Sequence, residues 1–382
     1  MTMCELIPTK NQAFPILIAG TLTSIKNEDR VVGESSCGSQ VPNRYRQIWS
    51  ELCKKEDKIL ADLLRMFKRN QSTITEFLLL GFGDLHNVKI LVFTLFLTVH
   101  IMALTANVLV IVLVGVTRSL HSPMYFFLSQ LSLSELLFTI NIVPNMLWLI
   151  LVGGGRVSVT RCIAQLYLLT VPTIAQCLFL ASMSFDRHVA ICRPLHYATI
   201  MTSYHQLQMI VSCWMLGFIL AVFLYIFSSK LEFCDFNTIN HFYCDIAPLL
   251  KLSCSDTSSV ELVVALVAFP VLLSTFSFII VTYISIIRTI LKIPSSTGRH
   301  KAFSTCSSHL IIVCMYYGTL SFIYLFPPRD NSIDLNKGLS VLYTLVTPLF
   351  NPLIYSLRNQ EIRAAIFSCI TFLWKPVESK DI

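Results

Sequence analysis

Seven long apolar stretches constrain the fold of this 382-residue chain more than any other feature. A helix needs about 20 apolar residues to cross a hydrocarbon core about 30 Å thick. Backbone amides in lipid must be paired within their own segment, which favours helices over open strands. The stretches cover about 88–114, 124–150, 163–185, 207–227, 261–287, 304–326 and 339–357. The sequence therefore predicts an all-α membrane protein, a bundle of seven transmembrane helices.

Composition and charge place most of the chain in lipid and indicate its orientation. Hydrophobic residues make up 54% of the chain and charged residues 13%, against about 25% charged in soluble domains. Cytoplasmic loops carry an excess of Lys and Arg. One side of the predicted bundle collects Arg118, Arg187, Arg193, Arg288, Lys292, Arg299, Lys301, Arg358 and Arg363. We therefore expect the N-terminus outside and the C-terminus in the cytoplasm, and the net charge of +7 does not indicate a nucleic-acid partner.

The chain divides into four predicted parts. Residues 1–65 have mixed charges, no sustained apolar run and no secretory signal pattern, so we expect an atypical, disordered N-terminal extension. A ligand-binding ectodomain is the alternative, but so polar a segment has little apolar surface to bury. We expect 66–87 to be extracellular, 88–357 to form the transmembrane domain, and 358–382 to form a cytoplasmic tail with a short amphipathic helix.

Four motifs carry a resemblance to a known family. They are LHSPMYFFL at 120–128, MSFDRHVAICRPLHY at 183–197, KAFSTCSSH at 301–309 and PLFNPLIYSLRN at 348–359. In this order they closely resemble the olfactory receptor family of rhodopsin-like G-protein-coupled receptors, from about Met66 to Trp374. The resemblance implies a multi-pass odorant receptor of the plasma membrane, which binds a small odorant and activates a heterotrimeric G protein of the stimulatory olfactory type, so that cyclic AMP rises.

Two other functions compete with this interpretation. An orphan chemosensory receptor acting outside the olfactory epithelium would have the same sequence features. A transporter or channel is disfavoured, because transporters tend to have paired repeats and matching broken helices in two halves, whereas this chain has an odd number of spans and no repeats. An enzyme is not expected, since no set of nucleophile, base and orienting residue is apparent. We also expect no cofactor.

The resemblance implies a switch at the cytoplasmic end of the bundle. Arg187 is expected to pair with Asp186 at rest and to contact the G protein when the helices move. His188 departs from the family, which usually has Tyr there. Pro348 and Pro352 each remove a backbone donor and make the seventh span deformable. The expected switch residues are Asp186, Arg187, Tyr283, Asn351, Pro352 and Tyr355; for the two tyrosines, a role as interfacial aromatics is the alternative.

Polar residues inside apolar spans form a second expected group. Asn107, Glu135 and Asn351 lie within predicted helices, where polar groups are costly and usually functional. They could instead clamp helices together, at about 0.6 to 2 kcal/mol per hydrogen bond. Relatives generally have Asp in place of Glu135 and often Glu in place of Gln176. With one buried carboxylate instead of two, the case for a sodium site is weak.

Four of the 13 cysteines lie on the expected outer side: Cys162, Cys234, Cys244 and Cys254. Four thiols allow three pairings, and the residues alone do not choose among them. The family resemblance implies Cys162 with Cys244 and Cys234 with Cys254. A four-cysteine zinc site lacks the close ligand spacing that such sites use, so no metal is expected.

The expected ligand pocket lies between the outer halves of spans three, five, six and seven, beneath the long loop at 228–260. Its candidate residues are Leu169, Thr170, Thr173, Tyr317, Ser321 and Tyr324. The outer part of span three, 163–173, has no carboxylate for an ammonium ligand. A mostly apolar pocket with a few hydroxyls suits a small, volatile, weakly polar molecule. Outside the bundle, Asn70 is the one Asn-x-Ser/Thr site and is expected to carry a glycan.

Overall fold

The computed structural model describes residues 74–234, 237–324 and 333–373. The predicted extension at 1–65 and the predicted glycosylation site Asn70 lie outside the described residues, as do the last nine residues of the predicted tail, 374–382.

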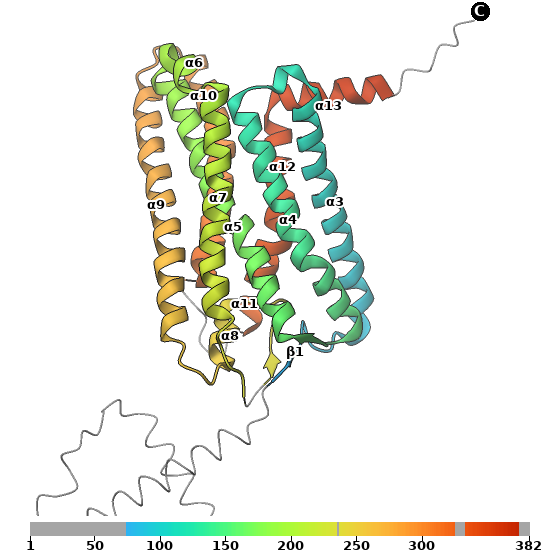
Figure 1. The fold of residues 1–382 in the computed structure, drawn as a ribbon. Coiled ribbons are helices and arrows are strands. Elements are labelled where there is room, and N and C mark those ends of the chain that lie inside the picture. The colour runs from blue at the N-terminus through green and yellow to red at the C-terminus, as the bar shows by residue number, and fades with distance from the viewer. Residues whose placement is uncertain (1–73, 235–236, 325–332, 374–382) are drawn as a thin grey trace, which may run out of the picture. The chain divides into compact units, whose positions relative to one another are not determined.

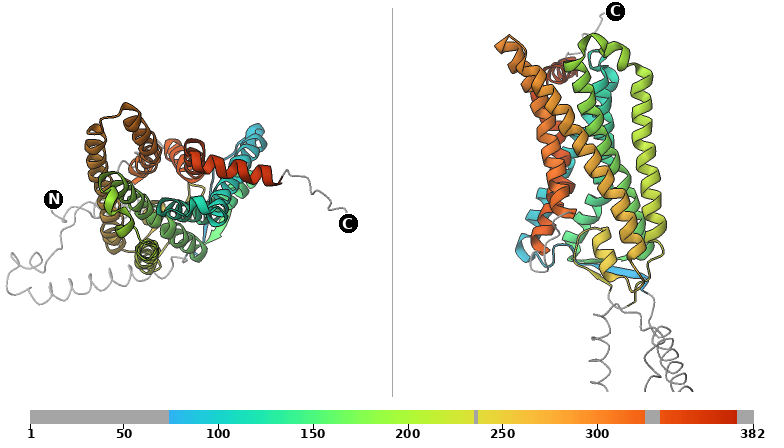
Figure 2. Two further views of the ribbon diagram at one scale, coloured as in Figure 1. Left: turned by 90° about the horizontal axis from the view of Figure 1, so that it is seen from above. Right: turned by 90° about the vertical axis from the view of Figure 1, so that its left-hand side faces the viewer.

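The predicted bundle of seven transmembrane helices is confirmed: within the described residues, seven helices are long and apolar enough to cross a membrane. They pack side by side along one direction (Figures 1 and 2). The seventh span is a composite of two α-helices joined by a five-residue π-helix, η5. The helices are α3 (Lys89–Val116), α4 (Pro123–Val152), α5 (Val159–Cys192), α7 (Ser203–Ser228), α9 (Ser258–Leu291), α10 (Ser296–Tyr324), and α11 (Ile333–Val341), η5 (Leu342–Val346) and α12 (Thr347–Arg358).

Helix α5 extends beyond the predicted span 163–185 at both ends, and local capping explains where it stops. It begins after Ser158, whose hydroxyl accepts a hydrogen bond from the Arg161 amide, a common N-terminal cap. It ends at Cys192, because Arg193 precedes Pro194 and is held out of helical geometry. Asp186 and Arg187 therefore lie within the helix and not at its end.

A small sheet, which the apolar pattern did not predict, closes one end of the bundle. Strand β1 (Glu76–Leu79) pairs antiparallel with β2 (Gly155–Ser158) and parallel with β3 (Thr238–Ile239). Phe77 and Leu79 on β1 are buried, with exposed fractions of 0% and 1%. This end, which also holds α8 (Ile246–Leu252), is called the sheet end below (Figure 1).

The opposite end holds η2 (Arg118–Leu120), α6 (Tyr197–Ile200) and α13 (Gln360–Leu373), and is called the α13 end (Figure 1). Helix α13 occupies most of the described part of the predicted tail and runs across the bundle. A hydrogen-bonded group anchors its start: Tyr125 of α4 donates to Glu361 Oε2 at 2.7 Å and accepts from Asn359 Nδ2 at 2.8 Å. Ile362 is buried and Phe367 is exposed, as expected for a helix at a membrane surface.

Helix α5 is the centre of the bundle. It packs against α4, α7 and α9, whereas α7 and α9 expose apolar side chains such as Phe223 and Leu273 to the lipid. Gly217 of α7 faces α5 so closely that an added Cβ would lie 3.0 Å from the carbonyl oxygen of Val171. Functional side chains on α5 can therefore contact three neighbouring helices.

Candidate functional site

A cavity of about 180 Å³ lies in the half of the bundle nearest the sheet end. Helix α5 forms one wall, α9 another, and α7, α10 and the loop after Cys244 complete it. The lining residues are Leu166, Leu169, Thr170, Thr173, Ile174, Cys177, Leu224, Asp245, Ile246, Val264, Val267, Ala268, Phe269, Val271, Leu272 and Leu320. Eleven of these sixteen side chains are aliphatic and one is aromatic, so the cavity suits a mainly apolar ligand.

The structure brings half of the predicted pocket residues to this cavity. Leu169, Thr170 and Thr173 line it. Tyr317 does not: its hydroxyl donates to Thr275 Oγ1 of α9 at 2.7 Å, which turns the ring into the packing between helices. Ser321 is likewise absent from the lining, and the side chain of Tyr324 lies outside the described residues.

The boundary of the cavity also differs from the prediction, which placed a wall on span seven. Among the described lining residues none comes from that span. Tyr343 of η5 instead reaches Thr173, with 3.1 Å between the two hydroxyl oxygens. The prediction did include span five, which is α9, but it named none of the lining residues between Val264 and Leu272, because they belong to an unbroken apolar run with no sign of which face is inward.

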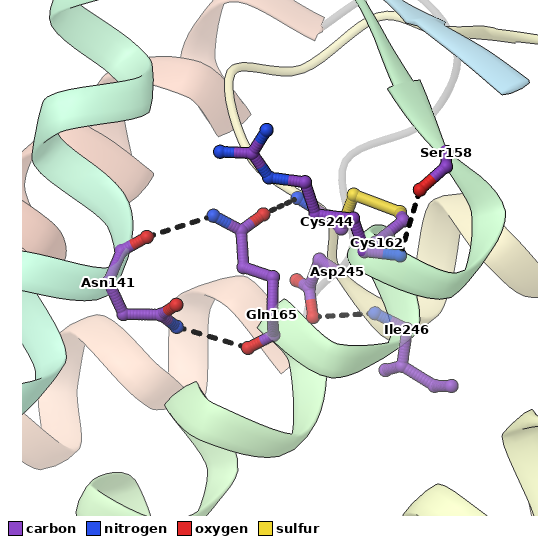
Figure 3. Close-up of a disulfide and its surroundings, with 8 residues drawn as sticks. Asn141, Ser158, Cys162, Gln165, Cys244, Asp245 and Ile246 are labelled. Atoms are coloured by element: carbon purple, nitrogen blue, oxygen red, sulfur yellow. Dashed lines mark hydrogen bonds between the residues drawn. A yellow bond between two sulfur atoms is a disulfide. The ribbon is translucent and has the colours of Figure 1, made fainter.

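The loop after Cys244 is fixed above the cavity by a covalent bond and by amide pairing. The structure has the disulfides Cys162–Cys244 and Cys234–Cys254, the pairs that the family resemblance implied. Gln165 of α5 accepts from the Cys244 amide at 3.0 Å and exchanges two 3.0 Å hydrogen bonds with Asn141 of α4 (Figure 3). The loop is thus tied to α5 beside the cavity, and α5 is tied to α4 by the same glutamine.

His241 ties the same loop to the seventh span. Its Nε2 lies 3.2 Å from Ser340 Oγ of α11, and the ring packs against Phe242 and Tyr243. Burial, together with the nearby positive charge of Lys337, lowers the pKa of His241 to about 3. The imidazole is therefore neutral at physiological pH, and it acts as a packed polar bridge and not as a cation.

Asn107 of α3 explains how the seventh span tolerates proline. Pro352 has no amide hydrogen, so the carbonyl of Pro348, four residues earlier, loses its helical donor. Asn107 Nδ2 donates to that carbonyl oxygen at 2.9 Å and to the Ala103 carbonyl at 3.0 Å. Because Asn107 is buried, with 2% of its surface exposed, its amide takes the place of the missing backbone donor.

Asn107→Leu is expected to destabilise the receptor by about 1 to 2 kcal/mol, because the Pro348 carbonyl would be buried without a partner. Thermal unfolding of the purified protein measures this as a lower midpoint. The matched control is Val108→Leu, the next residue, whose side chain is half exposed toward lipid. An unchanged midpoint for Asn107→Leu would contradict the proposed bridging role.

The buried carboxyl Glu135 also faces the seventh span. It is 2% exposed, and Asn351 Nδ2 donates to its Oε1. The structure therefore brings Asn107, Glu135 and Asn351 onto the same helix–helix contact, between α3, α4 and α12. Gln176 on α5 is buried too, but the described residues include no hydrogen bond between it and Glu135.

Near the α13 end, Asp186 has a different partner from the one predicted. Asp186 is 1% exposed, and its Oδ1 accepts a hydrogen bond from Tyr197 Oη of α6 at 2.8 Å. In the part of the chain that the structure describes, no ion pair joins it to Arg187. Neighbouring residues on a helix point in different directions, so the expected resting pair does not form. Burial and the nearby carboxylate of Asp186 raise the pKa of Tyr197.

The two predicted switch tyrosines are buried inside the bundle, which disfavours the interfacial alternative. Tyr283 of α9 is 4% exposed and Tyr355 of α12 is 3% exposed. Tyr283 Oη lies 2.8 Å from His309 Nδ1 of α10, and His309 Nε2 lies 3.2 Å from the Leu180 carbonyl oxygen of α5. Three helices are thereby connected, and the contact on α5 lies six residues before Asp186. His309 was quoted in a sequence motif, but its role was not predicted.

Comparison with known proteins identifies the family. A family model described as "Olfactory receptor" matches residues 96–372. The chain belongs to the olfactory receptor family. Olfactory receptor 6Q1 of Homo sapiens is 42% identical over 305 residues, covering 79% of this chain and 96% of that protein. Olfactory receptor 5P68 of Mus musculus is 43% identical over 297 residues, covering 78% and 95% respectively.

Membership places this olfactory receptor in the plasma membrane as a multi-pass, odorant-type G-protein-coupled receptor, and not among the enzymes. The cavity lies in the half of the bundle near the sheet end, and the hydrogen bonds of Asp186 and Tyr283 lie in the half near the α13 end.

Proposed function

We propose that this receptor binds a small, weakly polar, volatile ligand in the cavity and activates a G protein of the stimulatory olfactory type, which raises cyclic AMP. The observation that carries the proposal is the aliphatic cavity on α5, roofed by a loop that is disulfide-bonded to the start of the same helix. A mainly apolar cavity of this kind favours neutral molecules that leave water readily.

A signal from the cavity has a short physical route to the other end. The last lining residue on α5, Cys177, precedes Arg187 by ten residues, or about 15 Å along a helix. A ligand that favours one arrangement of α5, α9 and α10 shifts the population of that arrangement at both ends. The switch residues Asp186, Arg187, Tyr283, Asn351, Pro352 and Tyr355 are proposed to respond to this shift.

The test is a broad odorant screen in cells that express the full chain and report cyclic AMP. We expect at least one small neutral odorant to raise cyclic AMP, and the rise to disappear in cells that lack stimulatory G-protein α subunits. Surface staining controls for expression. A response that persists without these subunits contradicts the coupling, and no response from a well-expressed receptor to any odorant contradicts the ligand class.

We further propose that the sheet end is extracellular and the α13 end cytoplasmic, which agrees with the excess of Lys and Arg in the loops at the α13 end. In that orientation the segment before β1 is extracellular, and Asn70 is its only glycosylation sequon. Asn70→Gln is expected to remove the single shift in mass that glycosidase treatment of the natural chain produces. Ser72→Ala, which breaks the same sequon, should behave identically, whereas a glycan retained in either variant rejects the assignment.

A further inference from the structure

The threonine hydroxyls on the α5 wall of the cavity already donate their hydrogens to backbone carbonyls of the protein. Thr170 Oγ1 donates to the Leu166 carbonyl oxygen at 2.7 Å, and Thr173 Oγ1 donates to the Leu169 carbonyl oxygen at 2.8 Å. A hydroxyl has one hydrogen and two lone pairs. What remains on both threonine oxygens is therefore the capacity to accept a hydrogen bond.

The neighbouring hydroxyl and thiol groups also donate their hydrogens within the protein. Since Thr173 gives its hydrogen to Leu169, the Tyr343 hydroxyl, 3.1 Å away, is the donor in their contact. Tyr316 Oη donates to the Thr173 carbonyl oxygen at 2.8 Å, and the Cys177 thiol, which lines the cavity, donates to Tyr316 Oη with a 3.7 Å sulfur–oxygen distance. No hydroxyl or thiol hydrogen on the described lining residues is left for a ligand.

The roof adds another acceptor. Asp245 lines the cavity and is 6% exposed, and its Oδ1 accepts from the Ile246 amide at 2.7 Å (Figure 3). The backbone amides of α5 and α9 along the walls are used within their helices.

We infer that this cavity selects ligands that donate a hydrogen bond, namely alcohols, phenols and thiols, over ketones, aldehydes and ethers of the same carbon skeleton. The inference rests on the proposed function. A donor ligand gains a hydrogen bond to the Thr170 hydroxyl oxygen. A carbonyl ligand enters the same apolar space but leaves its own acceptor unpaired, and an unpaired buried polar group costs affinity.

The size of the cavity narrows the class. An apolar protein cavity of about 150 Å³ accommodates benzene, and this one has a volume of about 180 Å³. A six-membered ring bearing one hydroxyl is therefore the fitting probe. Cyclohexanol, cyclohexanone and methoxycyclohexane share the ring and differ in whether they can donate.

The experiment compares these three probes on cells expressing the full chain, with cyclic AMP as the readout. We expect the half-maximal concentration of cyclohexanol to be at least tenfold lower than that of cyclohexanone or methoxycyclohexane. Equal or greater potency of the ketone or ether overturns the inference. If the receptor responds to other odorants but not to cyclohexanol, the inference is also overturned, while the proposed function stands. If it responds to no odorant, the result contradicts the proposed function itself.

Variants of Thr170 test whether its hydroxyl oxygen causes the preference for alcohols. Thr170→Val removes the hydroxyl at nearly constant volume and is expected to weaken cyclohexanol potency about tenfold, with cyclohexanone unchanged. Thr170→Ser keeps the oxygen and should respond like the natural chain. Thr319→Val is the matched control, because its hydroxyl also bonds within a helix, to the Met315 carbonyl at 2.7 Å, without lining the cavity. An undiminished alcohol preference in Thr170→Val would remove this residue from the inference.

Discussion

Arg187→Ala is expected to abolish odorant-evoked cyclic AMP while leaving the amount of receptor at the cell surface within about a factor of two of the natural chain. Among the described residues Arg187 makes no ion pair, and it is only partly buried. Its removal therefore breaks no ion pair among the described residues and leaves the Tyr197–Asp186 hydrogen bond in place. The folding penalty should stay within about 1 kcal/mol.

The signalling loss should be far larger than the folding penalty, because the guanidinium has no ion-pair partner among the described residues and is proposed to contact the G protein. Arg187 lies on α5, which packs against α4, α7 and α9, so it is placed where several helices meet. Arg187→Lys, which keeps the charge but loses the planar fork of donors, should retain a small part of the response.

Arg156→Ala is the control for loss of an arginine. Arg156 lies on β2 at the sheet end, 79% exposed and 3.8 Å from Glu76, and such exposed pairs contribute little. The control should signal normally. A normal odorant response from Arg187→Ala at equal surface density would rule out the proposed role of Arg187.

Loss of the Cys162–Cys244 disulfide is expected to have the largest effect on stability. The bond closes a loop with a sequence separation of 82 residues, for which the chain-entropy model gives about 4 to 5 kcal/mol. Cys234–Cys254, with a separation of 20, gives about 3 kcal/mol. Cys162→Ser should therefore reduce surface expression more than Cys234→Ser does.

The double variant distinguishes a bond from two independent thiols. Cys162→Ser and Cys244→Ser should be equally damaging, and the two together no worse than either alone, since partners in one bond are not additive. Cys314→Ser, at an exposed free cysteine of α10, should be neutral. Additive losses of surface expression would show that the two cysteines act separately.

The sequence predicted the helices well because lipid leaves few alternatives. An apolar run of about 20 residues has one stable backbone solution in a bilayer, so the bundle follows from run length alone. Strand β1 has four residues, and its partners lie about 80 and 160 positions later. No local pattern records such pairing, and the sheet was missed. The disulfide pairing came from family resemblance, because the residues alone left three choices.

Predictions about the candidate site failed where they depended on side-chain direction. Asp186 and Arg187 are adjacent in sequence, which suggested a pair, but both lie inside α5, where the side chains of adjacent residues point in different directions. Tyr317 was predicted to line the pocket, but its hydroxyl donates a hydrogen bond to Thr275 on another helix. Such outcomes depend on how one helix is rotated against its neighbour, and this rotation is set by packing over the whole bundle.

The position of β1 at the centre of its sheet has a consequence for synthesis. Its first partner, β2, follows α4 in the chain, and its second, β3, follows α7, so four spans must be made before the sheet can close. At about 5 to 20 residues per second, the 159 positions between Leu79 and Thr238 take about 8 to 32 seconds. During that interval β2 becomes available to one edge of β1, whereas the edge that pairs with β3 has no strand partner until the end.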